Sequence, residues 1–186
     1  LYFFASTNNK ITEDEPEVLD SPTVEPSVTP DSDAFVTDQG LVSEDLPPFA
    51  KAQFKTDFSK HSISYEEILS GGPPKDGIPA IDNPLFITVP EANDWLHPQE
   101  PVILLQIDCV ARAYPIQILI YHEIVNDEFE GRNIAITYCP LCGTGMAFDS
   151  AYQNGFGVSG LLYNSDMLLF DRETESLWSQ IKMTAI

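Results

Sequence analysis

The chain has 186 residues, and its 29 acidic residues against 9 Lys and Arg give a formal net charge of −20. Nucleic acid and anionic membrane surfaces are themselves densely negative, so this balance disfavours both as partners. No stretch of about 18 apolar residues is present, so no transmembrane segment is predicted. Residues 1–50 hold 11 of the acids, one base and 6 of the 15 prolines. The composition therefore predicts an acidic arm or linker over 1–50 and a single domain over 51–186.

The arm is rich in Pro, Thr, Ser and acids between residues 12 and 48. Such a segment cannot bury enough apolar surface to offset its ordering entropy, which predicts an extended, polyproline-like tether. The alternative is an arm that wraps a partner protein and becomes ordered there. Its apolar start, Leu1 to Ser6, is either the tail of a secretory signal or an arbitrary beginning of the sequence.

The domain reads mainly as short strands. Ser64 and Glu67 have the spacing of a capping box before a short helix that ends at Ser70. Further helices are predicted at 90–96 and 115–125, and strands at 101–110, 133–138, 146–152, 156–163 and 167–170. Asn154-Gly155 is a strong hairpin signal between the strands on either side of it. The predicted fold class is β-rich α+β, an antiparallel sheet or partly open barrel with a few short helices.

The most informative motif is the Cys-Pro-Leu-Cys turn formed by Cys139 to Cys142. Two thiols in such a turn can chelate a metal, cycle between dithiol and disulfide, or form a static disulfide that closes the loop. The third cysteine, Cys109, leaves an odd total, which argues against a dense disulfide framework.

His122 is the candidate third ligand because it lies upstream of the pair, and Glu123 beside it could orient its ring. Two thiolates and an imidazole suit zinc or copper, and also iron. Near the end of the chain, Arg172 lies in an Asp-Arg-Glu sequence that predicts a turn with local ion pairs. Its functional alternative is a contact to an anion.

Seven segments of the sequence occur together in an order that resembles one family. They are Asp76–Pro84, Ala111–Pro115, His122–Asp127, Tyr138–Gly143, Gly157–Gly160, Asn164–Asp166 and Asp171–Gln180. In this order they strongly resemble the domain of unknown function 3179 family of bacterial and archaeal proteins. The resemblance implies that the Cys pair and the His-Glu pair belong to the family pattern and that the protein is exported. It implies no established activity.

The resemblance also implies that relatives continue for several strands beyond Gln180. The chain is then either a fragment or completed by another subunit at an exposed sheet edge. Cys109 lies outside the family pattern and is expected to be a small buried hydrophobe.

Two functional hypotheses follow from these residues. The first is an exported protein with a metal or thiol-redox site at Cys139, Cys142 and His122, holding a zinc, copper or iron ion. The second is a structural or interaction subunit of an extracellular or surface assembly, in which the Cys pair is a disulfide staple. Its contacts with a protein partner, or with itself, would involve the N-terminal arm and the C-terminal edge. The sequence does not decide whether the protein is an enzyme.

Overall fold

The structure is a computed structural model that describes residues 2–7, 36–37, 51–150 and 152–186. The tether and docking interpretations of the arm concern residues that lie mostly outside these ranges. The predicted domain boundary near residue 50 stays a prediction.

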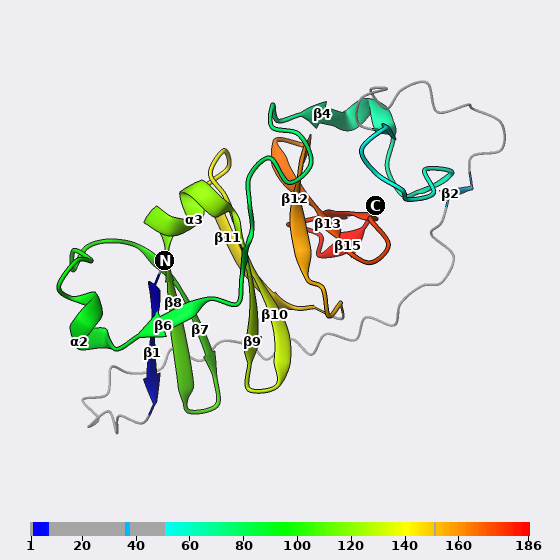
Figure 1. Cartoon of the computed structure of the whole chain (residues 1–186). Helices are drawn as coiled ribbons and strands as arrows, with labels where there is room; N and C mark the ends of the chain where they lie inside the picture. Colours follow the sequence, from blue (N-terminus) through cyan, green and yellow to red (C-terminus); the bar gives the residue numbers. More distant parts are fainter. Residues whose placement is uncertain (1, 8–35, 38–50, 151) are drawn as a thin grey trace, which may run out of the picture.

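Three sheets follow one another across the molecule, from left to right in Figure 1. The first sheet has the order β6 (Leu85–Ile87), β1 (Tyr2–Thr7), β8 (Val110–Pro115) and β7 (Val102–Ile107). The second has the order β11 (Thr144–Asp149), β10 (Arg132–Cys139), β9 (Ile124–Phe129) and β5 (Ile81–Asp82). The third has the order β15 (Thr184–Ala185), β14 (Leu177–Ser179), β13 (Asp166–Asp171), β12 (Phe156–Tyr163) and β4 (Ile68–Ser70). A small pair joins β2 (Val36–Thr37) to β3 (Lys60–His61), and the helices are η1 (Tyr65–Glu67), α2 (Val89–Ala92) and α3 (Ile116–His122).

Strand β10 is buried on both faces and separates two parts of the core. Because successive side chains of a strand point to opposite faces, Ile134 and Ile136 pack in one hydrophobic cluster with residues of the first sheet. Ala135 and Cys139 pack in another cluster, which includes Met167 of the third sheet. The alternation along β10 therefore places the Cys139 side chain at the contact between the second and third sheets.

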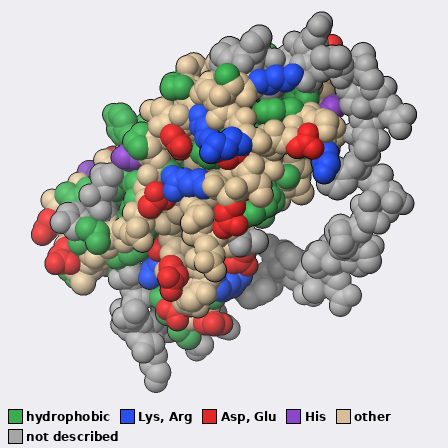
Figure 2. All heavy atoms as spheres, turned by 45° about the vertical axis from the view of Figure 1, so that its right-hand side comes forward, with side chains coloured by type: hydrophobic (Ala, Val, Ile, Leu, Met, Phe, Trp, Pro, Cys, Tyr) green, Lys and Arg blue, Asp and Glu red, His purple; other side chains and the backbone are tan. Residues whose placement is uncertain are grey.

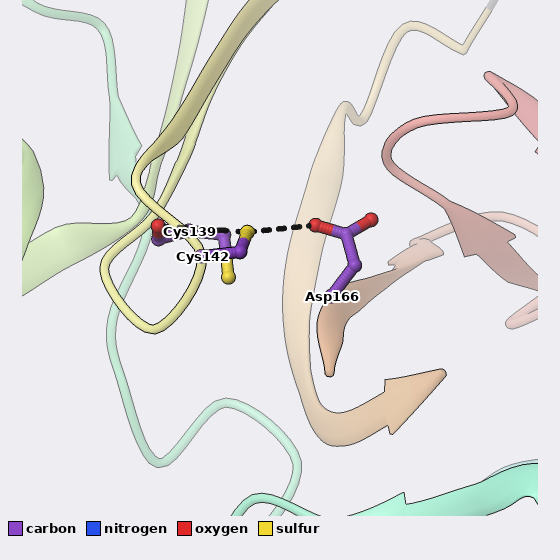
Figure 3. A group of neighbouring side chains, drawn as sticks. All are labelled: Cys139, Cys142 and Asp166. Atoms are coloured by element: carbon purple, nitrogen blue, oxygen red, sulfur yellow. Dashed lines mark hydrogen bonds between the residues drawn. The ribbon is translucent and has the colours of Figure 1, made fainter. Parts of the chain in front are cut away.

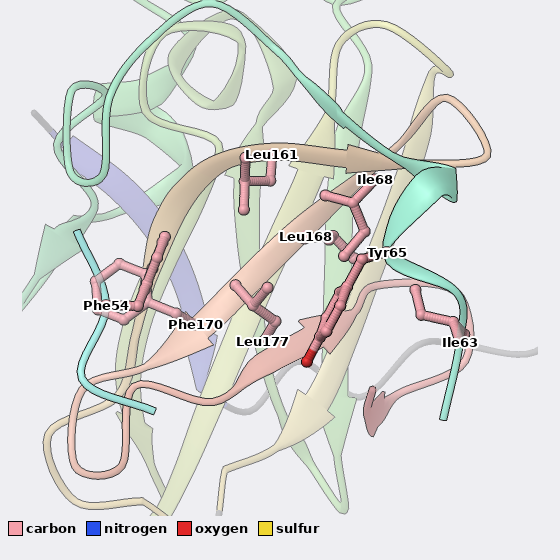
Figure 4. Packing of buried hydrophobic residues seen from close by; sticks show 8 residues of the cluster. All are labelled: Phe54, Ile63, Tyr65, Ile68, Leu161, Leu168, Phe170 and Leu177. Atoms are coloured by element: carbon pink, nitrogen blue, oxygen red, sulfur yellow. The ribbon is translucent and has the colours of Figure 1, made fainter. Parts of the chain in front are cut away.

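The far side of the third sheet is covered by the segment around η1. Leu168 and Phe170 of β13 pack there against Phe54 and Tyr65, as Figure 4 shows. Phe54 and Phe170 meet edge to face, with ring centroids 5.6 Å apart. Strand β13 is thus fully buried between two apolar layers. This packing holds the residues at its two ends, Asp166 and Asp171, in fixed positions.

The N-terminal residues Tyr2–Thr7 form an inner strand of the first sheet, and not a free end. Strand β1 pairs parallel to β6 and antiparallel to β8. The Phe3 side chain is completely buried and lies against Phe86 and Tyr114. The burial of the Phe3 side chain is therefore explained by sheet packing.

The hairpin predicted at Asn154-Gly155 is wrong. Strand β11, which precedes this turn, pairs with β10, whereas β12, which follows it, pairs with β13 and β4. The turn is real, with Gly155 at a φ of +68°, but it carries the chain from the second sheet to the third. Two-residue hairpins with positive φ at both positions occur instead at Glu130-Gly131 and Asn164-Ser165.

The remaining local predictions are mostly confirmed. Strands β7, β10 and β13 and helix α3 lie within or close to their predicted ranges. The capping box at Ser64 is wrong, because its side chain makes no cap hydrogen bond. A complete capping box is present at Thr88 and Glu91, which open helix α2. The fold class is confirmed as β-rich α+β, with antiparallel sheets and no closed barrel among the described residues. None of the described helices has the length and apolar character needed to cross a bilayer.

Candidate metal centre

The Cys-Pro-Leu-Cys segment forms the tight turn between β10 and β11. Cys139 ends β10 and is paired with Thr144, the first residue of β11. Gly143, at a φ of +65°, donates its backbone N–H to the carbonyl of Cys139 at 2.9 Å and closes the turn. Cys139 is buried and Cys142 is exposed. The turn therefore places the Cys139 sulfur between the second and third sheets and the Cys142 sulfur near the surface.

Asp166 approaches this turn from the third sheet. It is the first residue of β13, directly after the Asn164-Ser165 hairpin, and it is 4% exposed. Its Oδ1 accepts a hydrogen bond from the Cys142 thiol at 3.2 Å, and its Oδ2 accepts one from the backbone N–H of Ile181 at 3.2 Å. Figure 3 shows the carboxylate pointing at the two cysteines across the boundary between sheets.

Cys139, Cys142 and Asp166 form a group that could hold a metal ion, and it is the single such group found among the described residues. One ligand atom from each residue lies within 4.8 Å of the other two. In a tetrahedral zinc site, with Zn–S about 2.3 Å and Zn–O about 2.0 Å, ligand atoms are about 3.3 to 3.8 Å apart. The Cys142 Sγ–Asp166 Oδ1 distance of 3.2 Å is already about that short, and the other two separations need to shorten by about 1.5 Å at most to reach one ion.

The exit of the turn is braced by a buried amide. The Gln180 Nε2 atom donates hydrogen bonds to the Thr137 hydroxyl at 2.9 Å and to the Thr144 carbonyl at 3.1 Å. Its Oε1 atom is buried with no partner among the described residues. The segment after β14 thus supports both sides of the group, because Ile181, the next residue, holds Asp166.

Burial favours the neutral thiol of Cys139 over a reactive thiolate. Removal from water, followed by the hydrogen bond with Cys142, raises the pKa of the Cys139 thiol to about 11. Thiol-redox sites need the opposite shift, commonly supplied by a helix N-terminus. Here the turn continues into strand β11 and no helix begins at the pair. A bound cation is the partner that would deprotonate such thiols.

The two sulfurs are not joined by a disulfide, and Cys109 is also a free thiol. Cys109 lies in the turn between β7 and β8 and is exposed, so its expected burial is wrong. It stands apart from the metal-ligand group.

The metal-ligand group found among the described residues does not include His122. His122 ends α3, and its Nδ1 lies 2.8 Å from the carbonyl oxygen of Pro79. Glu123 does not orient that ring in any contact the structure shows. Instead, Glu123 lines a cavity together with Cys139, and burial raises the pKa of its carboxyl to about 7.

Arg172 is bound within the protein. Its guanidinium donates to both oxygens of Asp82, at 2.8 and 2.9 Å. On the face shown in Figure 2, Lys and Arg side chains lie among Asp and Glu and form no continuous basic surface. All of the hydrogen bonds that the Arg172 guanidinium makes to described residues come from Nη1, and the anion contact at Arg172 stays a prediction.

Sequence reasoning missed Asp166 as a member of this group. One signal was available: an acid directly precedes the apolar run Met167 to Phe170, so it enters a buried strand without an obvious counter-charge. Only the packing of the β12–β13 hairpin against the Cys turn gives that acid its neighbours.

Residues 75–186 match the model of the family described as "Protein of unknown function (DUF3179)". The chain belongs to this family. The matched residues of this DUF3179 member include all three residues of the metal-ligand group and Glu123. Neither the curated proteins nor the solved structures contain a match.

Proposed function

We propose that this DUF3179 protein binds a zinc ion through Cys139, Cys142 and Asp166, leaving a fourth position open to water or a substrate. The observation that carries the proposal is the convergence of two thiols and one buried carboxylate from two different sheets. Three protein ligands and one open position are the arrangement of catalytic zinc sites, whereas structural sites are closed by four protein ligands.

The donor set favours zinc over the other two metals considered. Copper(I) prefers thiolates and thioethers, and iron–sulfur clusters are usually held by four cysteines. Zinc accepts sulfur and carboxylate oxygen together at similar distances. The raised pKa of the Cys139 thiol argues against dithiol cycling, which needs a thiolate at neutral pH.

The test is zinc binding by the full chain. Metal content is measured after purification, and zinc affinity is measured by competition with a chromophoric chelator. Cys139→Ser and Asp166→Asn should each weaken zinc binding by more than the roughly 10- to 100-fold caused by loss of a group that supports a ligand, because each variant removes a ligand itself. Cobalt loading should give thiolate-to-metal charge-transfer absorption that Cys139→Ser diminishes.

Two variants are controls. Cys109→Ser removes an exposed thiol outside the group and should leave zinc affinity unchanged. His122→Gln separates this ligand set from the one suggested by the sequence, and it should also have no effect. Loss of zinc in His122→Gln but not in Asp166→Asn would contradict the proposal. A stable Cys139–Cys142 disulfide with no metal would favour the structural-staple function instead.

Export and assembly remain part of the proposal. A metal-bound thiolate pair resists oxidation, so this site is compatible with an exported protein in an oxidising compartment. Cell fractionation tests the location. Light scattering of the full chain tests whether it associates with itself, for which strand β15 offers a short sheet edge whose residues are exposed.

A further inference from the structure

A cavity of about 250 Å³ adjoins the inner cysteine of the proposed zinc site. Most of its lining is apolar and comes from the second and third sheets and from α3, including Ile120, Leu141, Val158 and Leu162. The polar side chains in the lining are the Cys139 thiol and the Glu123 carboxyl. At about 30 Å³ for each non-hydrogen atom, the cavity has room for a ligand of about eight such atoms.

The Glu123 carboxyl has no hydrogen bond or ion pair among the described residues, and burial is the single cause of its pKa shift. An acid that faces an apolar cavity without a partner is costly in the free protein. It becomes favourable when a bound ligand supplies a positive charge or a hydrogen-bond donor. The net charge of −20 also raises the local concentration of cations over that of anions.

The backbone at Glu123 gives a second, independent observation. The residue follows the last turn of α3 with a φ of 59° and a ψ of −32°, a region that favours glycine. A glycine there would end the helix with less strain, and glycine is the common choice at helix ends. The strained position holds a glutamate whose side chain reaches the cavity. Strain of this kind concentrates at ligand-binding sites.

We propose that this cavity binds a small aliphatic primary amine, with its ammonium group paired to the Glu123 carboxylate and its hydrocarbon chain against the apolar lining. The position of the cavity beside Cys139 makes such an amine the ligand class that would approach the open position of the zinc centre. This last step rests on the proposed function, whereas the binding of an amine does not.

The test uses n-hexylamine and n-hexanol, two probes of equal chain length that differ in charge. Each is titrated into the full chain at pH 8 in a calorimeter. The amine should bind at least about tenfold more tightly than the alcohol, a difference of about 1.4 kcal/mol. In Glu123→Gln the preference should disappear, while the weak affinity for hexanol remains. Equal affinities in the unmodified protein would overturn the proposal.

Glu130→Gln is a matched control, because Glu130 is an exposed glutamate that also has a positive φ, of 50°. It should keep the full preference for the amine. Glu123→Gly keeps the backbone fold and removes the strain. It should unfold at the same temperature as the unmodified protein or a higher one, yet lose the preference. Retained preference in either Glu123 variant would overturn the proposal.

Zinc affinity is measured on the same variants so that the two proposals fail separately. Asp166→Asn should lose zinc and still prefer hexylamine, whereas Glu123→Gln should lose the preference and still bind zinc. Loss of the amine preference in Asp166→Asn, with its fold intact, would overturn an amine site that is independent of the metal.

Discussion

At the scale of single residues, the buried Asp171 and the partly buried Glu123 show how differently this fold surrounds its acids. Burial alone would raise the pKa of Asp171, but hydrogen bonds from Thr174, Trp178 and Glu173 outweigh it and hold the pKa below its usual value. Glu123 receives no such donors, and its pKa rises to about 7. The Asp171 carboxylate therefore stabilises the folded state through its hydrogen bonds. The Glu123 carboxylate destabilises it, and a bound ligand that supplies a donor or a positive charge would remove that destabilisation.

The cost at Glu123 predicts a pH-dependent stability. The carboxyl titrates near 4.5 in the unfolded chain and near 7 in the folded one, so the folded state binds more protons between these values. Its contribution therefore lowers stability as pH rises from about 4.5 to 7, and the loss is complete above 7. Glu123→Gln should be about 1–2 kcal/mol more stable than the unmodified protein at pH 8, a value reduced for partial exposure, and nearly equal at pH 5.

Urea unfolding at the two pH values measures this difference. Glu130→Gln, at an exposed turn position, should follow the unmodified protein at both. The contrary result would be a Glu123→Gln variant that is destabilised relative to the unmodified protein at pH 8 but not at pH 5. It would mean that the ionised carboxylate has a stabilising partner in the folded state.

At the scale of elements, strand β1 connects β6 to the β8–β7 pair of the first sheet. It lies between β6 and β8, and the buried Phe3 ring joins Phe86 and Tyr114 in one aromatic cluster. Truncating a buried phenylalanine to alanine costs about 3–5 kcal/mol. Phe3→Ala should therefore lower the free energy of unfolding by about that amount and expose the β8 edge.

Leu85→Ala is the control for this strand, because Leu85 lies on neighbouring β6 with 60% of its surface exposed. Its effect on the unfolding free energy should stay within about 0.5 kcal/mol. If Phe3→Ala changed the unfolding free energy as little as Leu85→Ala, the Phe3 ring would not be packed in the core. Strand β1 would then contribute little to the stability of the first sheet.

Elements with a strong local signal were predictable from the sequence, and their partners were not. Strand β10 is predictable because a strand buried on both faces is a continuous apolar run in the sequence. Helix α3 is predictable because its buried residues lie on one side of the helix, which sets their spacing in the sequence. Asn154-Gly155 encodes a turn equally well, but nothing local says that the strands beside it belong to different sheets. The same limit explains the site: the Cys turn is local and was found, while Asp166 reaches it only through sheet-on-sheet packing.

At the scale of the whole molecule, the proposed zinc site joins two sheets that share no strand pairing. Cys139 and Cys142 belong to the β10–β11 turn of the second sheet, and Asp166 belongs to β13 of the third. The second and third sheets are also joined by an apolar cluster and by hydrogen bonds of Asn126 with the Phe156 backbone and of Gln180 with Thr137 and Thr144. An ion bound by all three side chains would add a polar link across that contact.

Zinc should consequently stabilise the folded chain as one unit. At a free zinc concentration 100 times the dissociation constant, linkage gives about 2.7 kcal/mol. For a protein of this size that corresponds to about 5–10 °C in the midpoint of thermal unfolding. A chelator should reverse the shift, and Asp166→Asn should remove most of it, while Cys109→Ser should show it in full.

Hydrogen exchange locates the stabilisation. Because the link spans two sheets, zinc should slow amide exchange in both the β10–β11 and the β12–β13 hairpins, and Asp166→Asn should abolish the effect in β12–β13 first. Protection confined to the Cys turn would mean that the ion is held by the two thiols alone. In that case Asp166 would serve only as the acceptor for the Cys142 thiol, the contact already present at 3.2 Å without any ion.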